Sequence, residues 1–189
     1  METAITRCAW LNNDPLYIKY HDEEWGVPVH DDQKMFEFLL LETFQAGLSW
    51  FTILKKRENF RAAFAQFDYK KVAKFDESKI QELLQNPGII RYRLKIESAI
   101  NNAQRFMEVQ KDFGTFCNYM WGFVDHKPII NKPKTIKDVP ATTPVSDALS
   151  KDLKKRGFKF VGSTTMYAHM QACGMVNDHT VDCICAPKS

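Results

Sequence analysis

Apolar residues recur at intervals of three and four along most of the chain, which is the period of helices with one buried face. Asp31 and Asp32 can cap a helix that carries a dense apolar run from Met35 to Leu41. The same spacing predicts helices near residues 51–65, 69–74, 76–86, 92–111 and 114–123. An alternating strand pattern is not found. The pattern therefore predicts an all-α protein.

Prolines interrupt this pattern between Asp125 and Pro144. Pro128, Pro133 and Pro140 also fall in this stretch, and proline fixes φ and removes a backbone donor. We expect an extended connection here, and it is the one candidate linker of the chain.

A helical hairpin is predicted after the connection. Apolar spacing starts at Ser146, stops at the glycine-bounded turn 157–162, and restarts at Ser163 towards Cys173. Two helices joined by a short turn form an αα-hairpin, and Ser163 is a suitable N-cap for the second helix. A helix N-terminus after a glycine-containing turn offers free N–H groups to an anion, so one DNA phosphate fits there.

Charge is weakly positive overall and clustered locally. The 189 residues carry a formal net charge of +3, which permits a nucleic-acid partner without demanding one. Basic residues gather in two groups: Lys151, Lys154, Lys155, Arg156 and Lys159, and then Lys55, Lys56, Arg57 and Arg61. Either group can instead be a solvated helix face.

Cysteine usage and hydropathy bear on location. Five scattered cysteines are an odd number, which argues against a secreted disulfide framework and favours a reducing cytoplasm. The sequence has no apolar stretch approaching the ~18 residues of a membrane span. We expect a cytoplasmic protein with no membrane partner.

Four potential metal ligands stand near the two ends of the chain: Cys8, His21, His179 and Cys183. Two thiolates and two imidazoles suit tetrahedral zinc, and four protein ligands leave no open position for water, so the ion would be structural. The first pair is separated by twelve residues, which is not a zinc-finger spacing. The alternative is two buried cysteines and two hydrogen-bonded histidines.

A series of short motifs follows in a fixed order along the chain. They are Cys8-Ala9-Trp10, Asp14-Pro15-Leu16-Tyr17-Ile18, residues 20–28, Gln45-Ala46-Gly47-Leu48-Ser49-Trp50, residues 54–58, Gly88-Ile89-Ile90-Arg91, residues 146–162 and Met170-Gln171-Ala172-Cys173-Gly174. Together they resemble the bacterial DNA-3-methyladenine glycosylase I family over about residues 8–185, with the four Cys and His residues at the family's zinc positions. The turn Val161-Gly162-Ser163-Thr164 resembles the helix-hairpin-helix motif of base-excision repair glycosylases, although Gly157-Phe158-Lys159-Phe160 replaces the usual Leu-Pro-Gly opening.

The resemblance implies a DNA repair enzyme that excises N3-methyladenine by hydrolysing its N-glycosidic bond and leaves an abasic site. It implies a helix-hairpin-helix glycosylase fold, in which one structural zinc ion joins the N- and C-terminal segments. Residues 1–189 would form a single unit, with a helical core over about 30–145, the hairpin over about 146–174, and a zinc clasp from 8–21 and 179–183. The expected partners are double-stranded DNA containing the lesion and the free base 3-methyladenine, and the expected enzyme is a monomer in the bacterial cytoplasm.

Glu42 is the catalytic and base-binding candidate. In the family, the matching glutamate recognises the base, so Glu42 would accept a hydrogen bond from the exocyclic amine and favour a positively charged ring. Tyr20 would supply a second contact, and Trp10, Trp25 and Trp50 would supply aromatic surfaces. From the residues alone, a lone acid in an apolar helix can equally face water or pair with a base, and tryptophans can simply pack in the core.

DNA contacts are expected from two loops. Gly47 permits close backbone approach, and Leu48 would wedge into the gap left by the flipped nucleotide unless it lies in the core. Phosphate contacts would come from Lys159, Gly162, Ser163 and Thr164.

Two departures from the wider superfamily predict a monofunctional enzyme without lyase activity. Thr164 stands where bifunctional relatives carry a lysine, and Asn177 stands nearest to the usual aspartate, with Asp178 displaced by one residue. Two alternatives stay open: a zinc-stabilised helix-hairpin-helix DNA-binding module without catalysis, and a metallohydrolase with an open coordination position.

Overall fold

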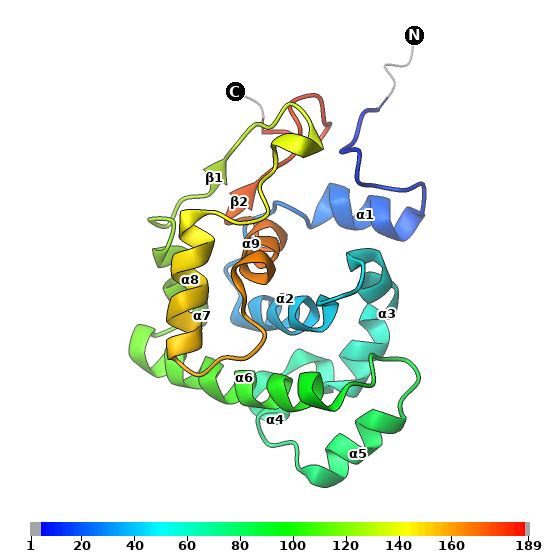
Figure 1. Cartoon of the computed structure of the whole chain (residues 1–189), viewed down its shortest axis with the longest axis vertical. Helices are drawn as coiled ribbons and strands as arrows, with labels where there is room; N and C mark the ends of the chain where they lie inside the picture. Colours follow the sequence, from blue (N-terminus) through cyan, green and yellow to red (C-terminus); the bar gives the residue numbers. More distant parts are fainter. Residues whose placement is uncertain (1–4, 188–189) are drawn as a thin grey trace.

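The computed structural model describes residues 5–187, and nine α-helices make up most of this range (Figure 1). They are α1 (Pro15–Glu23), α2 (Asp32–Gln45), α3 (Trp50–Ala63), α4 (Tyr69–Val72), α5 (Glu77–Gln85), α6 (Arg93–Phe113), α7 (Phe116–Gly122), α8 (Pro144–Lys155) and α9 (Ser163–Ala172). Two short 3₁₀-helices, η1 (Ala65–Phe67) and η2 (Ile136–Asp138), complete the helical structure of these residues. The prediction of a helical protein is confirmed, while α1 was not predicted. Within the described range no helix is long and apolar enough to cross a membrane.

Helix α2 lies at the centre of the structure and forms the middle of the core (Figure 1). Its residues from Met35 to Phe44 are all buried, because α3, α6, α7 and α9 pack around it. The N-cap of α2 is Asp31, whose side chain accepts a hydrogen bond from the Lys34 N–H. A helical stretch that is surrounded on every side holds its carboxylates inside the protein, and the buried stretch of α2 carries two, Glu37 and Glu42.

Glu37 is neutralised by a buried arginine. Arg57 Nε donates to Glu37 Oε1 at 2.6 Å, and its two terminal nitrogens donate to the Glu24 carboxylate at 2.8 Å each. Arg57 therefore joins α3 to α2 and to the end of α1, and it is not part of a solvated basic face. Lys55, in the same basic group, is exposed.

Two short strands hold the connection 125–144 in place. β1 (Ile129–Ile130) pairs in parallel with β2 (Val176–Asn177), with Ile129 opposite Val176. Strands of two residues are too short to show an alternating pattern, so these two were not predicted. The other residues of 125–143 are turns, bends and irregular backbone around η2, so the connection is not an α-helix, as predicted, but it is not extended throughout.

The last two helices form the predicted hairpin, but their caps differ from those expected. α8 begins at Pro144, before Ser146, and the Thr143 side chain caps it by accepting from the Ser146 N–H. Gly162 stands at the N-cap of α9, which has no side-chain cap, and Ser163 is the first residue of that helix. The prediction that Ser163 caps α9 is therefore wrong.

The Ser163 hydroxyl is held by α8 instead. It donates to Asp147 Oδ1 at 2.6 Å and lies 2.8 Å from Ser146 Oγ. A second bond between the two arms runs from Ser150 Oγ to the Val161 carbonyl at 2.6 Å. The side chain that was expected to satisfy the first N–H groups of α9 thus fastens the hairpin together.

Candidate functional site

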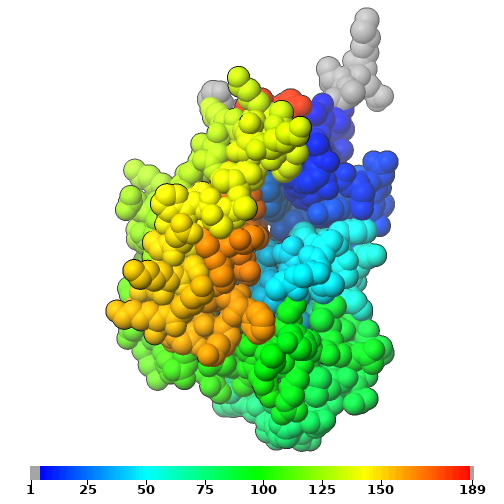
Figure 2. Space-filling view, viewed as in Figure 1, coloured from blue at the N-terminus to red at the C-terminus, as the bar shows by residue number. Residues whose placement is uncertain are grey.

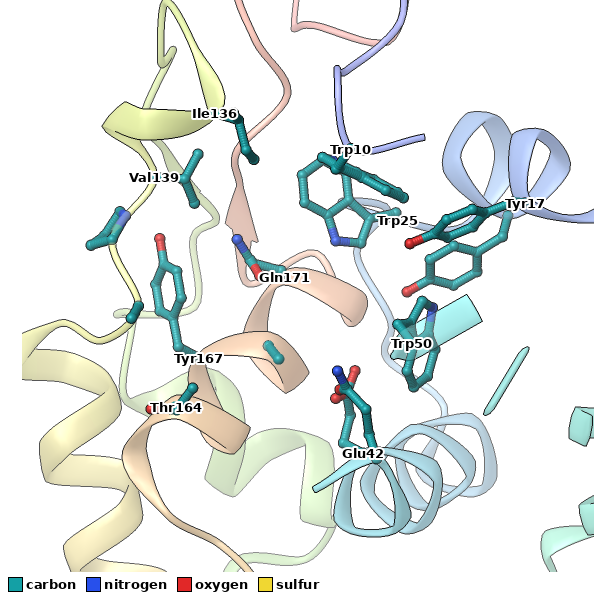
Figure 3. Close-up of a pocket in the computed structure, with 15 residues that line it drawn as sticks. Trp10, Tyr17, Trp25, Glu42, Trp50, Ile136, Val139, Thr164, Tyr167 and Gln171 are labelled. Carbon is teal, nitrogen blue, oxygen red and sulfur yellow. The ribbon is translucent and has the colours of Figure 1, made fainter. Parts of the chain in front are cut away.

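A cavity of about 310 Å³ opens between the N-terminal part of the chain and the segment that leads into α9. Figure 2 shows the surface hollowed where the yellow and orange segments face the blue and cyan ones. The lining side chains come from α1 and the segments just before and after it, from α2, α3 and α9, and from the connection before α8 (Figure 3): Trp10, Tyr17, Tyr20, Trp25, Glu42, Gln45, Trp50, Ile136, Val139, Pro140, Ala141, Thr164, Tyr167, Ala168 and Gln171.

Every residue that we predicted to hold a base lines this cavity. The Trp10 and Trp25 rings meet edge to face with their centroids 5.0 Å apart, and the Tyr20 ring lies 5.5 Å from that of Trp50. Figure 3 shows Trp50 and Glu42 at the same side of the space. The fold therefore brings together, from four separate segments, the aromatic surfaces and the carboxylate.

Glu42 is enclosed, and within residues 5–187 no basic side chain forms an ion pair with it. Its side chain is 3% exposed, and burial raises its pKa to about 8. Among the described residues nothing donates a hydrogen bond to its Oε2. Burial and the nearby Glu42 carboxyl also raise the pKa of Tyr20 well above its ordinary value. The alternatives in which Glu42 faces water or pairs with a basic residue are wrong.

Two tryptophans of the cavity also carry a buried polar atom without a hydrogen-bond partner among the described residues. Trp10 Nε1 and Trp50 Nε1 are buried without a hydrogen-bond partner in the part of the chain that the structure describes. Unpaired buried polar atoms are costly, at roughly 1–3 kcal/mol each. Three such atoms around one cavity indicate a ligand that offers donors and acceptors together.

Glu42 should make stability fall as pH rises. Between the ordinary glutamate pKa of 4.5 and the raised value of about 8, the unfolded chain releases this proton while the folded chain keeps it. The free energy of unfolding therefore decreases across this window, by an amount on the order of a few kcal/mol. Glu42→Gln should remove this component, as measured by urea unfolding of both proteins at pH 5 and pH 8. A slope that is equal in the two proteins would contradict the assignment.

Several lining residues were missed by the sequence analysis. On α9, Thr164, Tyr167, Ala168 and Gln171 all line the cavity, and their spacing of three and four residues places them on one face of a helix. The sequence shows that spacing, but nothing in it distinguishes the polar residues of this face from polar residues on the surface of any helix. Thr164, which was expected to contact a DNA phosphate, also lines the cavity.

The other missed wall is the connection itself. Ile136, Val139, Pro140 and Ala141 close one side of the cavity, as Figure 3 shows for Ile136 and Val139. The candidate linker is therefore part of the site. Its apolar residues follow neither a helical nor an alternating spacing, so no periodic signal predicted that they pack.

The loop after α2 has the exposed geometry expected of a DNA contact. Gly47 has φ +81° with open space where a side chain would stand, and Leu48 is 39% exposed. The alternative that Leu48 lies in the core is wrong. The loop is anchored by the Lys95 ammonium, which donates to the carbonyls of Phe44 and Ala46 at 2.7 and 2.8 Å.

The hairpin turn is held by α6. Asn102 Nδ2 donates to the Lys159 carbonyl at 3.0 Å, and Asn102 Oδ1 accepts from the Lys159 N–H at 2.8 Å. The Lys159 side chain is exposed. Arg156, which belongs to the first of the two basic groups in the sequence, is ion-paired with Asp152 and Asp112.

The four predicted metal ligands lie together and are all buried, with their ligand atoms within 4.8 Å of one another. Cys183 Sγ is 3.5 Å from His21 Nε2 and 3.4 Å from His179 Nδ1, and Cys8 Sγ is 3.6 Å from His179 Nδ1. Tetrahedral zinc with bonds of about 2.3 Å to sulfur and about 2.0–2.1 Å to nitrogen separates such atoms by roughly 3.5 Å. The cluster has the dimensions and chemistry of a metal site.

The second nitrogen of each histidine is also engaged. His21 Nδ1 lies 2.7 Å from Asp22 Oδ1, and His179 Nε2 lies 3.0 Å from the Trp25 carbonyl. Arg7 donates to the Asp22 carboxylate, and that hydrogen bond is the largest cause that lowers the pKa of Asp22 to about 2. Such partners fix a ligand histidine in its tautomer and orientation. The contact at Trp25 also connects the cluster to the wall of the cavity.

Removing the Asp22 carboxylate should weaken metal binding. Asp22→Asn removes the charge that orients His21, and we expect an affinity about 10- to 100-fold lower, by competition with a chelator. Asp182→Asn, an exposed change in the C-terminal segment, is the matched control and should leave the affinity unchanged. Equal affinities for both variants would show that Asp22 does not support the site.

Comparison with known proteins identifies the family. The family model for methyladenine glycosylase matches residues 10–186. The chain belongs to the methyladenine glycosylase family. It is 54% identical to DNA-3-methyladenine glycosylase 1 of Escherichia coli K12, over 97% of this chain and 98% of that protein. It is 52% identical to DNA-3-methyladenine glycosylase of Haemophilus influenzae, over 95% of this chain and 97% of the relative.

Solved structures of methyladenine glycosylases have the same fold. A crystal structure of 3-methyladenine DNA glycosylase I superposes with a TM-score of 0.94 at 53% identity, covering 96% of this chain and all of the other. A structure of the Staphylococcus aureus enzyme, determined to explain 3-methyladenine recognition, gives a TM-score of 0.94 at 37% identity over 99% of this chain and 100% of the other. The family predicted from the ordered motifs is confirmed.

Proposed function

We propose that this chain is a DNA-3-methyladenine glycosylase, which turns the damaged nucleotide out of the duplex and hydrolyses its N-glycosidic bond to leave an abasic site. The observation that carries the proposal is the buried Glu42 carboxylate, unpaired within the described residues, in a cavity lined by tryptophans. The names of the relatives support the same activity. The base would be read outside the stack, where its edge is accessible.

The cavity supplies what a cationic leaving base needs. Methylation at N3 places positive charge on the purine, so the base leaves readily while the sugar gains oxocarbenium character. A cationic base beside Glu42 favours the ionised carboxylate, which accepts from the exocyclic amine. An indole face adds on the order of 1–2 kcal/mol for a desolvated cation. Tyr20, Trp10, Trp25 and Trp50 would hold the base in this position.

DNA would be gripped at two places beside the cavity. α8, its turn and α9 would act as a helix-hairpin-helix element in which Gly162 and Lys159 meet the backbone. Ser163 and Thr164 remain candidates for phosphate contacts through their backbone N–H groups. Leu48, with Gly47 beside it, would fill the gap left by the flipped nucleotide. Residues 1–189 would act as one unit and as a monomer in the cytoplasm.

The metal would be one structural zinc ion. Cys8, His21, His179 and Cys183 fill four positions, so no open position would remain for a reacting water. The ion would join the two ends of the chain and brace Trp10 and Trp25, because the His21 ring lies 5.3 Å from Trp10 and the His179 ring lies 4.7 Å from Trp25.

Incubation with duplex DNA containing N3-methyladenine tests the function. We expect free 3-methyladenine and an equal yield of abasic sites, measured by chromatography and by alkaline strand cleavage. A DNA-binding module would release no base. Borohydride should trap no covalent adduct with DNA, since the hairpin carries Thr164 and no lysine at the position of a lyase nucleophile. A trapped adduct would overturn the monofunctional assignment.

A further inference from the structure

Asp178 is a buried carboxylate with no part in the chemistry described above. Its side chain is 2% exposed, and three donors converge on it, two from α9 and one from the connection 125–144. Tyr167 Oη donates to Oδ2 at 2.6 Å, Gln171 Nε2 donates to Oδ2 at 2.8 Å, and Asn131 Nδ2 donates to Oδ1 at 2.8 Å. Two of these donors, Tyr167 and Gln171, also line the cavity.

This arrangement fixes the orientation of the Gln171 amide. An ionised carboxylate only accepts hydrogen bonds, so the amide nitrogen must face Asp178 and the amide oxygen must face away from it. No described residue donates to Gln171 Oε1. Figure 3 shows the Gln171 side chain between Tyr167 and the Trp10 and Trp25 rings. The oxygen is therefore free to accept a hydrogen bond from a ligand in the cavity.

We propose that Asp178 is a positioning residue that locks Gln171 as a second hydrogen-bond acceptor in the cavity, and that Gln171 thereby selects a purine with an exocyclic amino group over one with a carbonyl at that edge. The proposal rests on the proposed glycosylase function and adds a specificity residue to it. An unlocked glutamine can present either its oxygen or its NH₂ group, so it accepts both kinds of purine. A glutamine held in one orientation places its amide oxygen against the carbonyl of the wrong purine. Two hydrogen-bond acceptors then face each other, which is costly in a buried site.

Asp178→Asn tests the lock without changing the size of the side chain. Duplex DNA carrying both N3-methyladenine and N3-methylguanine is the substrate, and release of each base is measured as kcat/KM. We expect release of 3-methyladenine to fall about tenfold and the ratio of 3-methylguanine to 3-methyladenine to rise about tenfold. Loss of the Asp178 charge alone would weaken both cationic lesions alike, so the ratio isolates the orientation of Gln171.

Gln171→Ala tests the same contact while leaving Asp178 with its other two donors, so it covers the case in which Asp178→Asn does not fold. It should shift the ratio by a similar factor, and adding Asp178→Asn to it should shift the ratio no further. Asp178 adjoins the proposed metal ligand His179, so a change at Asp178 could act through the metal site. The metal content of each variant and the control variant Asp182→Asn test for such an indirect effect. If the wild-type protein releases 3-methyladenine but neither variant changes the ratio, the proposal is overturned. If the wild-type protein releases nothing, the proposed function itself fails.

Discussion

Glu42→Gln should lower the release of 3-methyladenine from DNA by roughly a hundredfold, equivalent to about 2.7 kcal/mol of transition-state stabilisation. Glutamine keeps the size of the side chain but removes the charge that favours a cationic base. Its amide can also turn a donor towards the amine of the lesion. The carboxylate is enclosed, so water cannot replace the lost interaction, and the full effect should appear in single-turnover excision.

The effect should be specific to the cavity. Trp50→Ala should reduce excision to a similar degree, because it removes an aromatic wall together with one of the unpaired indole N–H groups. Glu58→Gln is the matched control, since Glu58 lies exposed on the outer side of α3 and should keep full activity. Full activity in both Glu42→Gln and Trp50→Ala would rule out this cavity as the base-binding site.

Cys8→Ala should release the metal and destabilise the fold. Where a site forms only in the folded state, the free energy of metal binding adds to the free energy of folding. We expect a loss of about 3 kcal/mol or more, which corresponds to a fall in Tm of about 6–12 °C for a chain of this size. Metal analysis and calorimetry of the purified proteins measure the two effects together.

Cys185→Ser is the control for this change. Cys185 lies beside the cluster and donates its N–H to Cys183 Sγ at 3.4 Å, but its side chain is not among the four clustered ligands that include Cys8. The control should keep the metal. The Cys8 variant should in addition bind 3-methyladenine more weakly, because His21 and His179 contact the rings of Trp10 and Trp25. Full metal content and an unchanged Tm in Cys8→Ala would show that the ligand set is wrong.

The helical core and much of the cavity were predictable from the sequence, because the dense apolar run of α2 indicates a buried helix and Glu42 is a carboxylate within that run. α1 was missed because a helix of nine residues is too short to show a clear helical period. The burial of Arg57 was not predicted, because a run of basic residues does not show that one of them pairs with a buried carboxylate such as Glu37. Ser163 was assigned to a cap that it does not make, because a tertiary partner, Asp147, competes for its hydroxyl.

The remaining wall of the cavity depends on contacts between distant segments. The connection 125–144 is fixed by its pairing with β2 and by the bond from Asn131 to Asp178. Neither contact can be predicted from local sequence, since each involves residues more than forty positions apart. The role of Gln171 likewise depends on Asp178, and only the folded chain brings these two side chains and the cavity together.

Titration of ¹⁵N-labelled protein with free 3-methyladenine tests the base-binding cavity most directly, through the indole N–H resonances of its tryptophans. Trp10 Nε1 and Trp50 Nε1 lack partners within the described chain, whereas Trp121 Nε1 lies outside the cavity and donates to the Val29 carbonyl at 2.7 Å. Saturable shifts at Trp10 and Trp50, with Trp121 unmoved and the affinity reduced in Glu42→Gln, are the predicted result. Shifts that are absent at Trp10 and Trp50, or that are no larger there than at Trp121, would contradict the assignment of this cavity to the base.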